Sequence, residues 1–298
     1  MRIAILHQDL EWAEEELQRQ FQSRDVQTNL YDVRKTLVSD LVDYDLVLNR
    51  VYASVANRNW RDNLTTLELL QSLENQGIPC LNSLQTTRVD YSKSYSAEVM
   101  RDAGILTPRT MLLNGEDKES ALEFGLRLGY PLIVKRDMGG RGKDLVRVNN
   151  ETELKQTLDH MLSPEYRAQY DAGIAIQEFL HSVGNHDCRI AIINGKLAFA
   201  YTRTLIPAGS TNDSWLASVS RGSEMFDYDP KPEEVAVALK ATKSIGALFN
   251  EVDMAFTEDG IAIIENNPTP NYDETELHRT TAVAKLITEK YRKGELKI

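Results

Sequence analysis

In the first eighty residues, short apolar runs typical of strands alternate with segments in which apolar residues recur at helical spacing. RIAIL at residues 2–6 is a short apolar run typical of a buried strand, and EWAEEELQRQF after it repeats apolar residues at helical spacing. Apolar runs near residues 26–31 and 45–51 predict two more strands, and a helix is predicted over 63–76. Strands and helices that alternate in this way predict an open α/β domain over residues 1–86.

The same two spacings continue around a glycine-rich segment in the middle of the chain. We expect a helix over residues 88–104, a strand after Pro108, and a second domain, of α+β type, over residues 87–175. The other elements expected there are a helix near 118–128, the strand PLIVKRD, the strand LVRV and a helix over 151–161.

From Ile174 onward the predicted strands are longer and closer together. Five runs, IAIQEFL, CRIAIING, KLAFAYTR, VDMAF and IAIIEN, surround one helix predicted near 232–249. This pattern favours an antiparallel sheet with helices, an α+β domain over residues 176–298. Residues 206–223 are instead rich in Gly, Ser and Asn, and we expect an irregular active-site loop there.

Composition narrows the class of protein. The 298 residues are 42% apolar and 27% charged, which is ordinary for a globular protein of about two or three domains. No tract reaches the ~20 apolar residues of a membrane span, and the acidic opening is unlike a signal peptide, so we expect a cytoplasmic protein. A net charge of −11 argues against nucleic-acid and membrane partners and favours a small substrate. Cys80 and Cys188 are expected to be buried and unpaired.

Three side chains that carry oxygen ligands stand near the C-terminal end. Glu265 and Asn267 fall on one face of an extended chain. A turn at residues 258–260 can fold the strand of Asp253 back beside them. Mg²⁺ prefers hard oxygen ligands and commonly takes one or two carboxylates together with water and substrate phosphates. The pattern predicts a magnesium site facing a nucleotide, and a solvated hairpin without metal is the alternative.

A second candidate site follows the predicted strand of Lys135, in the segment RDMGGRGKD. Gly139, Gly140 and Gly142 let backbone amides approach a polyphosphate closely. Lys135 adds positive charge beside them, and Lys143 or Arg141 can add more. The spacing matches neither the P-loop nor the dinucleotide-binding GxGxxG pattern, so a flexible hairpin tip stays an open alternative.

The order of these features resembles the ATP-grasp superfamily. A strand lysine, a glycine-rich loop, the segment Gln177-Glu178-Phe179-Leu180 and a terminal Glu-x-Asn-Pro follow one another as they do there. Within it, the chain resembles the RimK-type alpha-L-glutamate ligases and related lysine-biosynthesis carboxylate–amine ligases, clearly over residues 88–275 and more loosely before them. The resemblance implies an ATP-grasp fold, in which an N-terminal open α/β domain precedes two α+β subdomains that bind ATP between them.

The resemblance also implies roles for single residues at matching motif positions. The expected ATP contacts are Lys93, Lys135, Gly139, Gly140, Gly142, Gln177, Glu178, Phe179, Leu180 and, near the ribose, Asp187. The expected ligands of Mg²⁺, for which Mn²⁺ can substitute, are Asp253, Glu265 and Asn267. Arg203 and Arg221 match arginines near the transferring phosphoryl group or the substrate carboxylate, and a planar guanidinium suits both.

Candidate substrate contacts are Arg50, Arg189 and Ser218. Arg50 ends a predicted strand, where α/β sheets bind their ligands, and a surface arginine paired with Asp45 or Asp62 is the alternative. Arg189 is expected on the same sheet face as Asp187 because the two are separated by one residue.

Two places depart from the family pattern. Asp144 replaces a third glycine of the loop, which is tolerable if Asp144 adopts the left-handed region. Leu216 and Ser218 stand where the glutamate ligases have Arg-x-Asn, so glutamate does not follow as the substrate.

The activity that the resemblance implies is ATP-dependent ligation of a carboxylate to an amine. The carboxylate would be phosphorylated and the acyl phosphate attacked by the amine, with release of ADP and phosphate. Loops 138–144 and 206–223 would then act as lids against water. Substrates are expected to be small acids and amines or a peptide or protein tail, and the protein is expected to form dimers or tetramers. A small-molecule kinase and a non-catalytic ATP-binding regulatory module are the alternatives.

Overall fold

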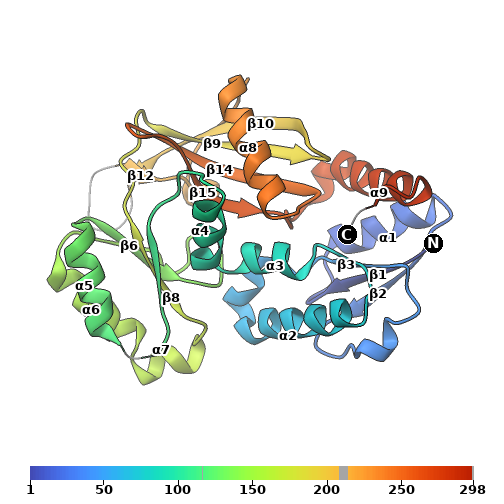
Figure 1. The fold of residues 1–298 in the computed structure, drawn as a ribbon, viewed down its shortest axis with the longest axis horizontal. Coiled ribbons are helices and arrows are strands. Elements are labelled where there is room, and N and C mark those ends of the chain that lie inside the picture. The colour runs from blue at the N-terminus through green and yellow to red at the C-terminus, as the bar shows by residue number, and fades with distance from the viewer. Residues whose placement is uncertain (116, 208–213, 297–298) are drawn as a thin grey trace.

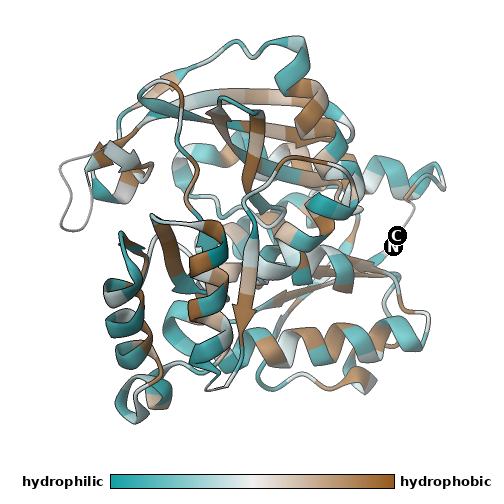
Figure 2. Cartoon of the chain, turned by 60° about the vertical axis from the view of Figure 1, so that its left-hand side comes forward, coloured by the Kyte–Doolittle hydropathy of each residue, from teal (hydrophilic) through white to brown (hydrophobic). Residues whose placement is uncertain are grey.

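Three sheets of four or five strands organise the described part of the chain, each with its own helices (Figure 1). The computed structural model describes residues 1–115, 117–207 and 214–296. Apolar residues gather along the strands, while the helices are polar on one side and apolar on the other (Figure 2). This mixed α/β and α+β architecture agrees with the predicted fold class.

The first sheet is parallel, with strand order β2-β1-β3-β4. Its strands are β1 (Arg2–His7), β2 (Gln27–Asp32), β3 (Leu46–Asn49) and β4 (Cys80–Leu81). Parallel neighbours need crossover connections, which α1 (Trp12–Gln22) and α2 (Ala56–Asn75) supply here. Helix α2 begins earlier than predicted, because a helical turn before Asn59 joins it across a kink at that residue. Two 3₁₀ turns, η1 (Val38–Asp40) and η2 (Ala53–Val55), follow β2 and β3.

The single helix expected over residues 88–104 is wrong, since two helices occupy this region. Helix α3 (Leu84–Tyr91) ends at Ser92, and α4 (Lys93–Asp102) begins directly after it. Ser92 is extended, its hydroxyl accepts the Tyr95 N–H, and it also donates to the Asp137 carboxylate at 2.6 Å. A capping serine tied to a distant aspartate therefore breaks the helix and places Lys93 at the first turn of α4.

The second sheet is antiparallel, with order β5-β8-β6-β7. Its strands are β5 (Thr110–Leu113), β6 (Leu132–Arg136), β7 (Val146–Val148) and β8 (Ile174–Glu178). Helices α5 (Lys118–Leu128) and α6 (Glu151–Met161) lie where the sequence predicts them, and Asn150 caps α6 by accepting the Glu153 N–H. A short helix that the sequence pattern did not predict, α7 (Pro164–Gln169), precedes β8.

The third sheet has the order β13-β10-β9-β14-β15, with all strand pairs antiparallel. Its strands are β9 (His186–Ile193), β10 (Lys196–Thr204), β13 (Met225–Asp227), β14 (Phe249–Thr257) and β15 (Gly260–Asn267). Helix α8 (Pro232–Ser244) covers one face, where Ala238 and Ala241 pack against Cys188, Ile190 and Val252. It is shorter than the predicted 232–249 helix. A small hairpin of β11 (Ile206–Pro207) and β12 (Ser214–Leu216) and the 3₁₀ turn η3 (Val219–Arg221) lie between β10 and β13.

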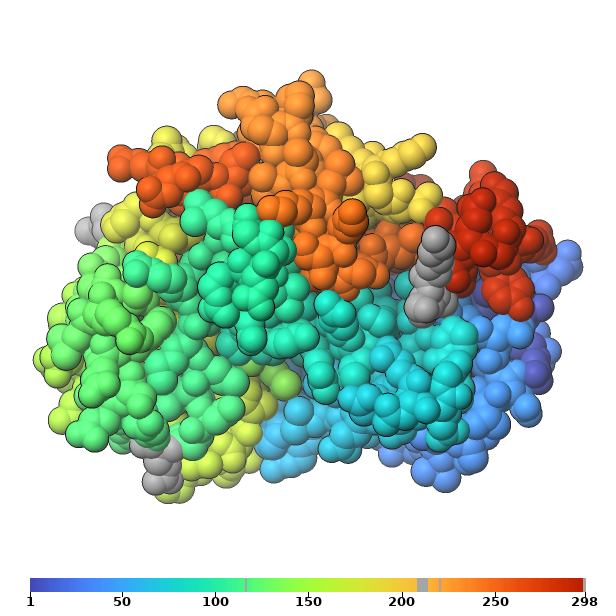
Figure 3. Space-filling view, in the orientation of Figure 1, coloured from blue at the N-terminus to red at the C-terminus, as the bar shows by residue number. Residues whose placement is uncertain are grey.

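The last helix, α9 (Leu277–Arg292), follows the 3₁₀ turn η4 (Glu274–Glu276) and was not predicted. It leaves the third sheet and packs against α1 of the first domain, as the red and blue elements show (Figures 1 and 3). Val283, Ala284 and Ile287 share a core cluster with Leu17 and Phe21. The end of the chain thus ties the third domain to the first.

Alternation along the third sheet leaves its second face for the functional groups. Cys188 and Ile190 point into the core beneath α8, so Asp187 and Arg189 point to the opposite face. Cys80 and Cys188 are buried and unpaired, as expected. Among the described helices, none has the length and apolar character needed to cross a membrane.

Candidate active site

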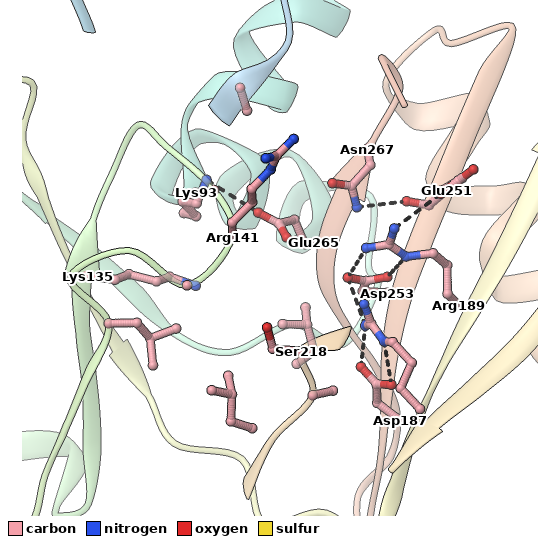
Figure 4. A pocket seen from close by; sticks show the side chains of 18 of the residues that line it. Lys93, Lys135, Arg141, Asp187, Arg189, Ser218, Glu251, Asp253, Glu265 and Asn267 are labelled. Atoms are coloured by element: carbon pink, nitrogen blue, oxygen red, sulfur yellow. Dashed lines mark hydrogen bonds and ion pairs between the residues drawn. The ribbon is translucent and has the colours of Figure 1, made fainter. Parts of the chain in front are cut away.

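A pocket of about 730 Å³ lies where the three domains meet. Its walls come from η2, the loop between β6 and β7, the end of β8, and the uncovered face of the third sheet. The wall contains most of the residues that the sequence analysis selected (Figure 4).

The acidic hairpin has the predicted geometry. Strands β14 and β15 pair so that Asp253 lies opposite Glu265, and Glu251 lies opposite Asn267. All four side chains line the pocket. Glu251 was missed by the sequence analysis, although the period of two could have found it two residues before Asp253.

Asp253 lies at the centre of a row of alternating charges. Arg189 donates to its carboxylate at 2.5 and 2.8 Å, and Arg203 lies 3.1 Å from it. Burial alone would raise the pKa of Asp253, but the charges of Arg189 and Arg203 outweigh burial and lower the pKa to about 2. The row continues from Arg203 to Asp187 at one end and from Arg189 to Glu251 at the other (Figure 4).

Beyond Glu251 the row reaches the C-terminal segment. Arg279 of α9 lies 3.5 Å from the Glu251 carboxylate and 2.5 Å from Glu276 of η4. Burial raises the pKa of Glu251, while Arg189 and Arg279 oppose that rise. Six ion-paired contacts therefore connect the uncovered face of the sheet to the helix that packs against α1.

The donor set of the hairpin fits a magnesium ion. Glu265 lies in the pocket wall with one oxygen 3.3 Å from the Lys93 ammonium. Asn267 donates its amide N–H to the Glu251 carbonyl at 3.1 Å, which leaves its amide oxygen to act as a ligand. Asp253 would share its oxygens with two guanidinium groups. Among the described residues, no group of three or more His, Cys, Asp or Glu side chains could hold a metal, so Asn267 and phosphate oxygens would complete the shell.

The glycine-rich loop is packed against the first domain. A Cβ on Gly139, whose φ is +137°, would meet the Asn57 side-chain oxygen at 2.9 Å, and a Cβ on Gly140 would meet Ser54 at 3.0 Å. The Asn57 amide donates to the Gly140 carbonyl at 2.9 Å. The loop is therefore a backbone cradle with no room for side chains at these two glycines, a form suited to polyphosphate.

Asp144 adopts the left-handed region that its position requires, with a φ of +52°. Its carboxylate accepts the Tyr166 hydroxyl at 2.8 Å and pairs with Arg136 at 2.6 Å. These contacts hold the end of the loop and compensate for the missing glycine. At Gly142, the exposed Arg221 donates to the carbonyl at 2.7 Å, so Arg221 joins this loop to the segment after β12.

Two lysines line the pocket together with the cradle. Lys93 donates to the Gly139 carbonyl and also pairs with Glu265. Lys135 is buried, and its ammonium donates to the Gln177 side chain at 2.9 Å. Burial lowers the pKa of Lys135 to about 8, with the nearby Glu265 carboxylate opposing the shift.

The far end of the pocket is apolar and aromatic. Phe179 lies edge-on to Trp215 at 6.1 Å between ring centroids, and the Arg147 guanidinium lies 4.5 Å over the Phe179 ring. Leu180 lines the same end, while Glu178 is held by Arg109 at 2.6 Å. Such a slot beside an exposed strand end suits a planar base.

The other selected residues have mixed positions. Arg189 and Ser218 line the pocket. Arg50 is buried, pairs with Glu14 at 3.3 Å and donates to the Pro270 carbonyl at 3.0 Å, so the alternative of a surface arginine is wrong. Arg221 contacts the loop without lining the pocket. Residues 208–213 of the expected lid lie outside the described residues.

Several residues of the pocket wall were not selected from the sequence, among them Asp90 of α3, Ser54 of η2 and Thr269 after β15. No local spacing identifies them, because only the packing of three domains brings these segments together.

The fold and this pocket define an ATP-grasp protein. The RimK domain protein ATP-grasp from Sphaerobacter thermophilus has the same fold, with a TM-score of 0.66 at 19% identity over 97% of this chain and 98% of that one. A family model described as the RimK-like ATP-grasp domain matches residues 91–290. The chain belongs to the RimK-like ATP-grasp family.

Relatives with curated names are ligases. The alpha-aminoadipate–LysW ligase LysX of Saccharolobus solfataricus is 26% identical over 220 residues, which are 73% of this chain and 76% of the relative. The probable alpha-L-glutamate ligase of Haemophilus influenzae is 25% identical over 236 residues, 79% of this chain and 72% of the relative. The predicted family, fold and ligase class are thereby confirmed.

Proposed function

We propose that this protein phosphorylates a substrate carboxylate with ATP and transfers the acyl group to an amine, releasing ADP and phosphate. The observation that carries the proposal is one pocket that joins a base slot, a glycine cradle with two lysines, and an oxygen-rich hairpin. The substrates we propose are an amino acid or a peptide on either side of the new bond, as the names of the relatives suggest.

Positively charged and acidic residues of the pocket would have different roles. Lys93, Lys135 and the loop amides at Gly139 and Gly140 would bind the phosphates. Mg²⁺, held by Asp253, Glu265 and Asn267, would neutralise phosphate charge when bound. No side-chain nucleophile is required, since positioning and charge neutralisation supply most of the catalysis of phosphoryl transfer.

Arginines would align the reacting groups. Arg203 is fixed by Asp187 and Asp253, and Arg189 by Asp253 and Glu251, so both guanidinium groups are positioned before substrate arrives. The contact from Arg221 to Gly142 would hold the two loops together over the pocket and exclude water from the acyl phosphate.

The carboxylate need not be glutamate. Leu216 is buried in the pocket wall and Ser218 lies two residues farther along, where the glutamate ligases carry Arg-x-Asn. Because the side chain at position 216 carries no positive charge, we propose a substrate with fewer negative charges than glutamate.

A trapping experiment tests the reaction. The protein would be incubated with Mg·ATP, hydroxylamine and a panel of amino acids, small acids and short peptides, with ADP and hydroxamate as readouts. We expect hydroxamate from one class of carboxylate and none from Lys135→Ala or Glu265→Ala, because these variants lose a phosphate and a metal contact. A stable phosphorylated product that needs no amine would identify a kinase. Mg·ATP binding without turnover would identify a regulatory module.

A second measurement concerns assembly. We also propose that the chain forms homodimers or homotetramers, and sedimentation velocity would show a single species of two or four chains. A monomer at micromolar concentration would contradict it.

A further inference from the structure

Asp90 differs from the other acidic residues of the described pocket wall in its lack of an ion pair. Of the seven acidic residues in the described pocket wall, six have a cationic side chain within 4 Å. The six with their partners are Glu178–Arg109, Asp187–Arg203, Glu251–Arg189, Asp253–Arg189, Glu265–Lys93 and Glu276–Arg279. The seventh, Asp90, has no ion pair among the described residues.

The setting of Asp90 makes a lone negative charge costly. Its residue is 5% exposed, and its Oδ2 atom has no hydrogen-bond partner. Asp90 lies in the last turn of α3, where the helix dipole also disfavours an anion. The Thr269 side chain and the positive charges of Lys93 and Arg50 favour the charged form of Asp90, but they do not outweigh its burial. An unpaired buried carboxyl group costs stability, so a function is the natural reason for keeping it.

The position of Asp90 lies beside the reacting end of the pocket. It lines the same pocket as Lys93 and Glu265, and it interacts electrostatically with both of them and with Arg50. Ala53 and Ser54 of η2 line the pocket on the same side as the glycine cradle. A group bound to Asp90 would therefore stand near a carboxyl group that is receiving a phosphate.

We propose that Asp90 binds the ammonium group of the acceptor amine and places its nitrogen beside the acyl phosphate. This inference rests on the proposed ligase function and names the residue that selects the nucleophile. An ammonium group would give Asp90 the close ion pair that it lacks among the described residues, and it brings three N–H donors for the carboxylate. A metal ion fits less well, because one carboxylate and one hydroxyl supply too few ligands.

One proton first leaves the ammonium nitrogen for solvent. The lone pair that this frees forms the C–N bond to the acyl carbon, and the bond from that carbon to the phosphate oxygen breaks with its electron pair leaving on phosphate. A second proton then leaves the nitrogen and departs on hydrogen phosphate. Asp90 positions the nitrogen and needs no net change of its own in this step.

The test compares two nucleophiles that differ in charge. Hydroxylamine is uncharged near neutral pH, whereas the amines of the standard L-amino acids are ammonium ions. Wild type, Asp90→Asn and Asp90→Ser would be assayed with the carboxylate that gives hydroxamate, using each nucleophile in turn. Asp102→Asn is the matched control, since Asp102 is an exposed aspartate on the neighbouring helix α4.

We expect both Asp90 variants to keep hydroxamate formation within about threefold of wild type. With the amino acid that serves wild type best, kcat/KM should fall about 100-fold, mainly through a higher KM, because a charge-assisted contact to the nucleophile is lost. Hydroxamate formation also reports that the variants are folded and still activate the carboxylate. Asp102→Asn should match wild type with both nucleophiles.

Several results would overturn the inference. Equal loss with both nucleophiles would place Asp90 in ATP or carboxylate binding, and no loss with either would leave it without a role. A wild-type protein that forms hydroxamate but accepts no ammonium-bearing nucleophile would also contradict it. Absence of hydroxamate with every carboxylate would instead overturn the ligase function itself.

Discussion

Burial shifts the pKa values of two ionisable residues in the pocket. Lys135 lies among the second sheet's strands with a neutral partner, Gln177, and burial lowers its pKa to about 8. Asp90 is the opposite case, since burial raises the pKa of its carboxyl group to about 7. Both groups therefore titrate within a range that solution experiments reach.

Binding of Mg²⁺ with a non-hydrolysable ATP analogue should weaken in alkaline solution. Only protonated Lys135 attracts phosphate, and with a pKa about 8 roughly nine in ten of these side chains are neutral at pH 9. We expect the dissociation constant, measured by calorimetry, to rise about tenfold between pH 7 and pH 9. Lys135→Gln should bind more weakly with a flat profile, whereas parallel profiles for the two proteins would contradict the assignment.

Replacing Asp90 by Asn should stabilise the protein in a pH-dependent way. Because the folded-state pKa of Asp90 lies above its unfolded value, the cost of its charge is fully present above pH 7 and disappears as the pH falls toward 4. We expect the midpoint of thermal unfolding to rise by roughly 5 °C at pH 8 and by much less at pH 5. A gain of equal size at both pH values would show that the carboxyl group is not the cause.

Some helices and strands can be predicted from the local sequence, whereas others depend on contacts with distant segments. The hairpin of β14 and β15 and the helix α6 follow from alternation and a capping asparagine, both of which are local. The break between α3 and α4 depends on the hydrogen bond from Ser92 to Asp137, 45 residues away. Asp90 and the buried pairing of Arg50 with Glu14 also depend on distant segments, so spacing could not identify them.

The glycine cradle should tolerate no side chain. Gly139→Ala would place a methyl group 2.9 Å from the Asn57 oxygen, so the loop would have to move away from the first domain. We expect Mg·ATP binding to weaken by about tenfold or more with little change in thermal stability. The matched control is Gly195→Ala, which also has a positive φ but meets nothing within 4 Å in the turn between β9 and β10. Equal effects of the two substitutions would refute a role for the cradle.

At the scale of the whole molecule, α9 joins the third domain to the first through its contact with α1. Ile287 is fully buried in the cluster that α9 forms with α1. Ile287→Ala should reduce the free energy of unfolding by about 2–4 kcal/mol, because it removes buried methyl groups and leaves a cavity. Chemical denaturation followed by tryptophan fluorescence would measure it. The exposed Leu277→Ala on the same helix is the control and should change stability by less than about 0.5 kcal/mol.

The row of charges from Asp187 to Glu276 limits which substitutions this pocket can accept during evolution. Each inner member of the row lies between charges of the opposite sign, so loss of one, such as Arg189, leaves Asp253 and Glu251 without a shared partner. A single substitution is then harmful wherever it falls, while a second one of compensating charge restores the balance. Descendants of this sequence should therefore cross from one substrate preference to another by paired replacements along the row, with few viable intermediates between them.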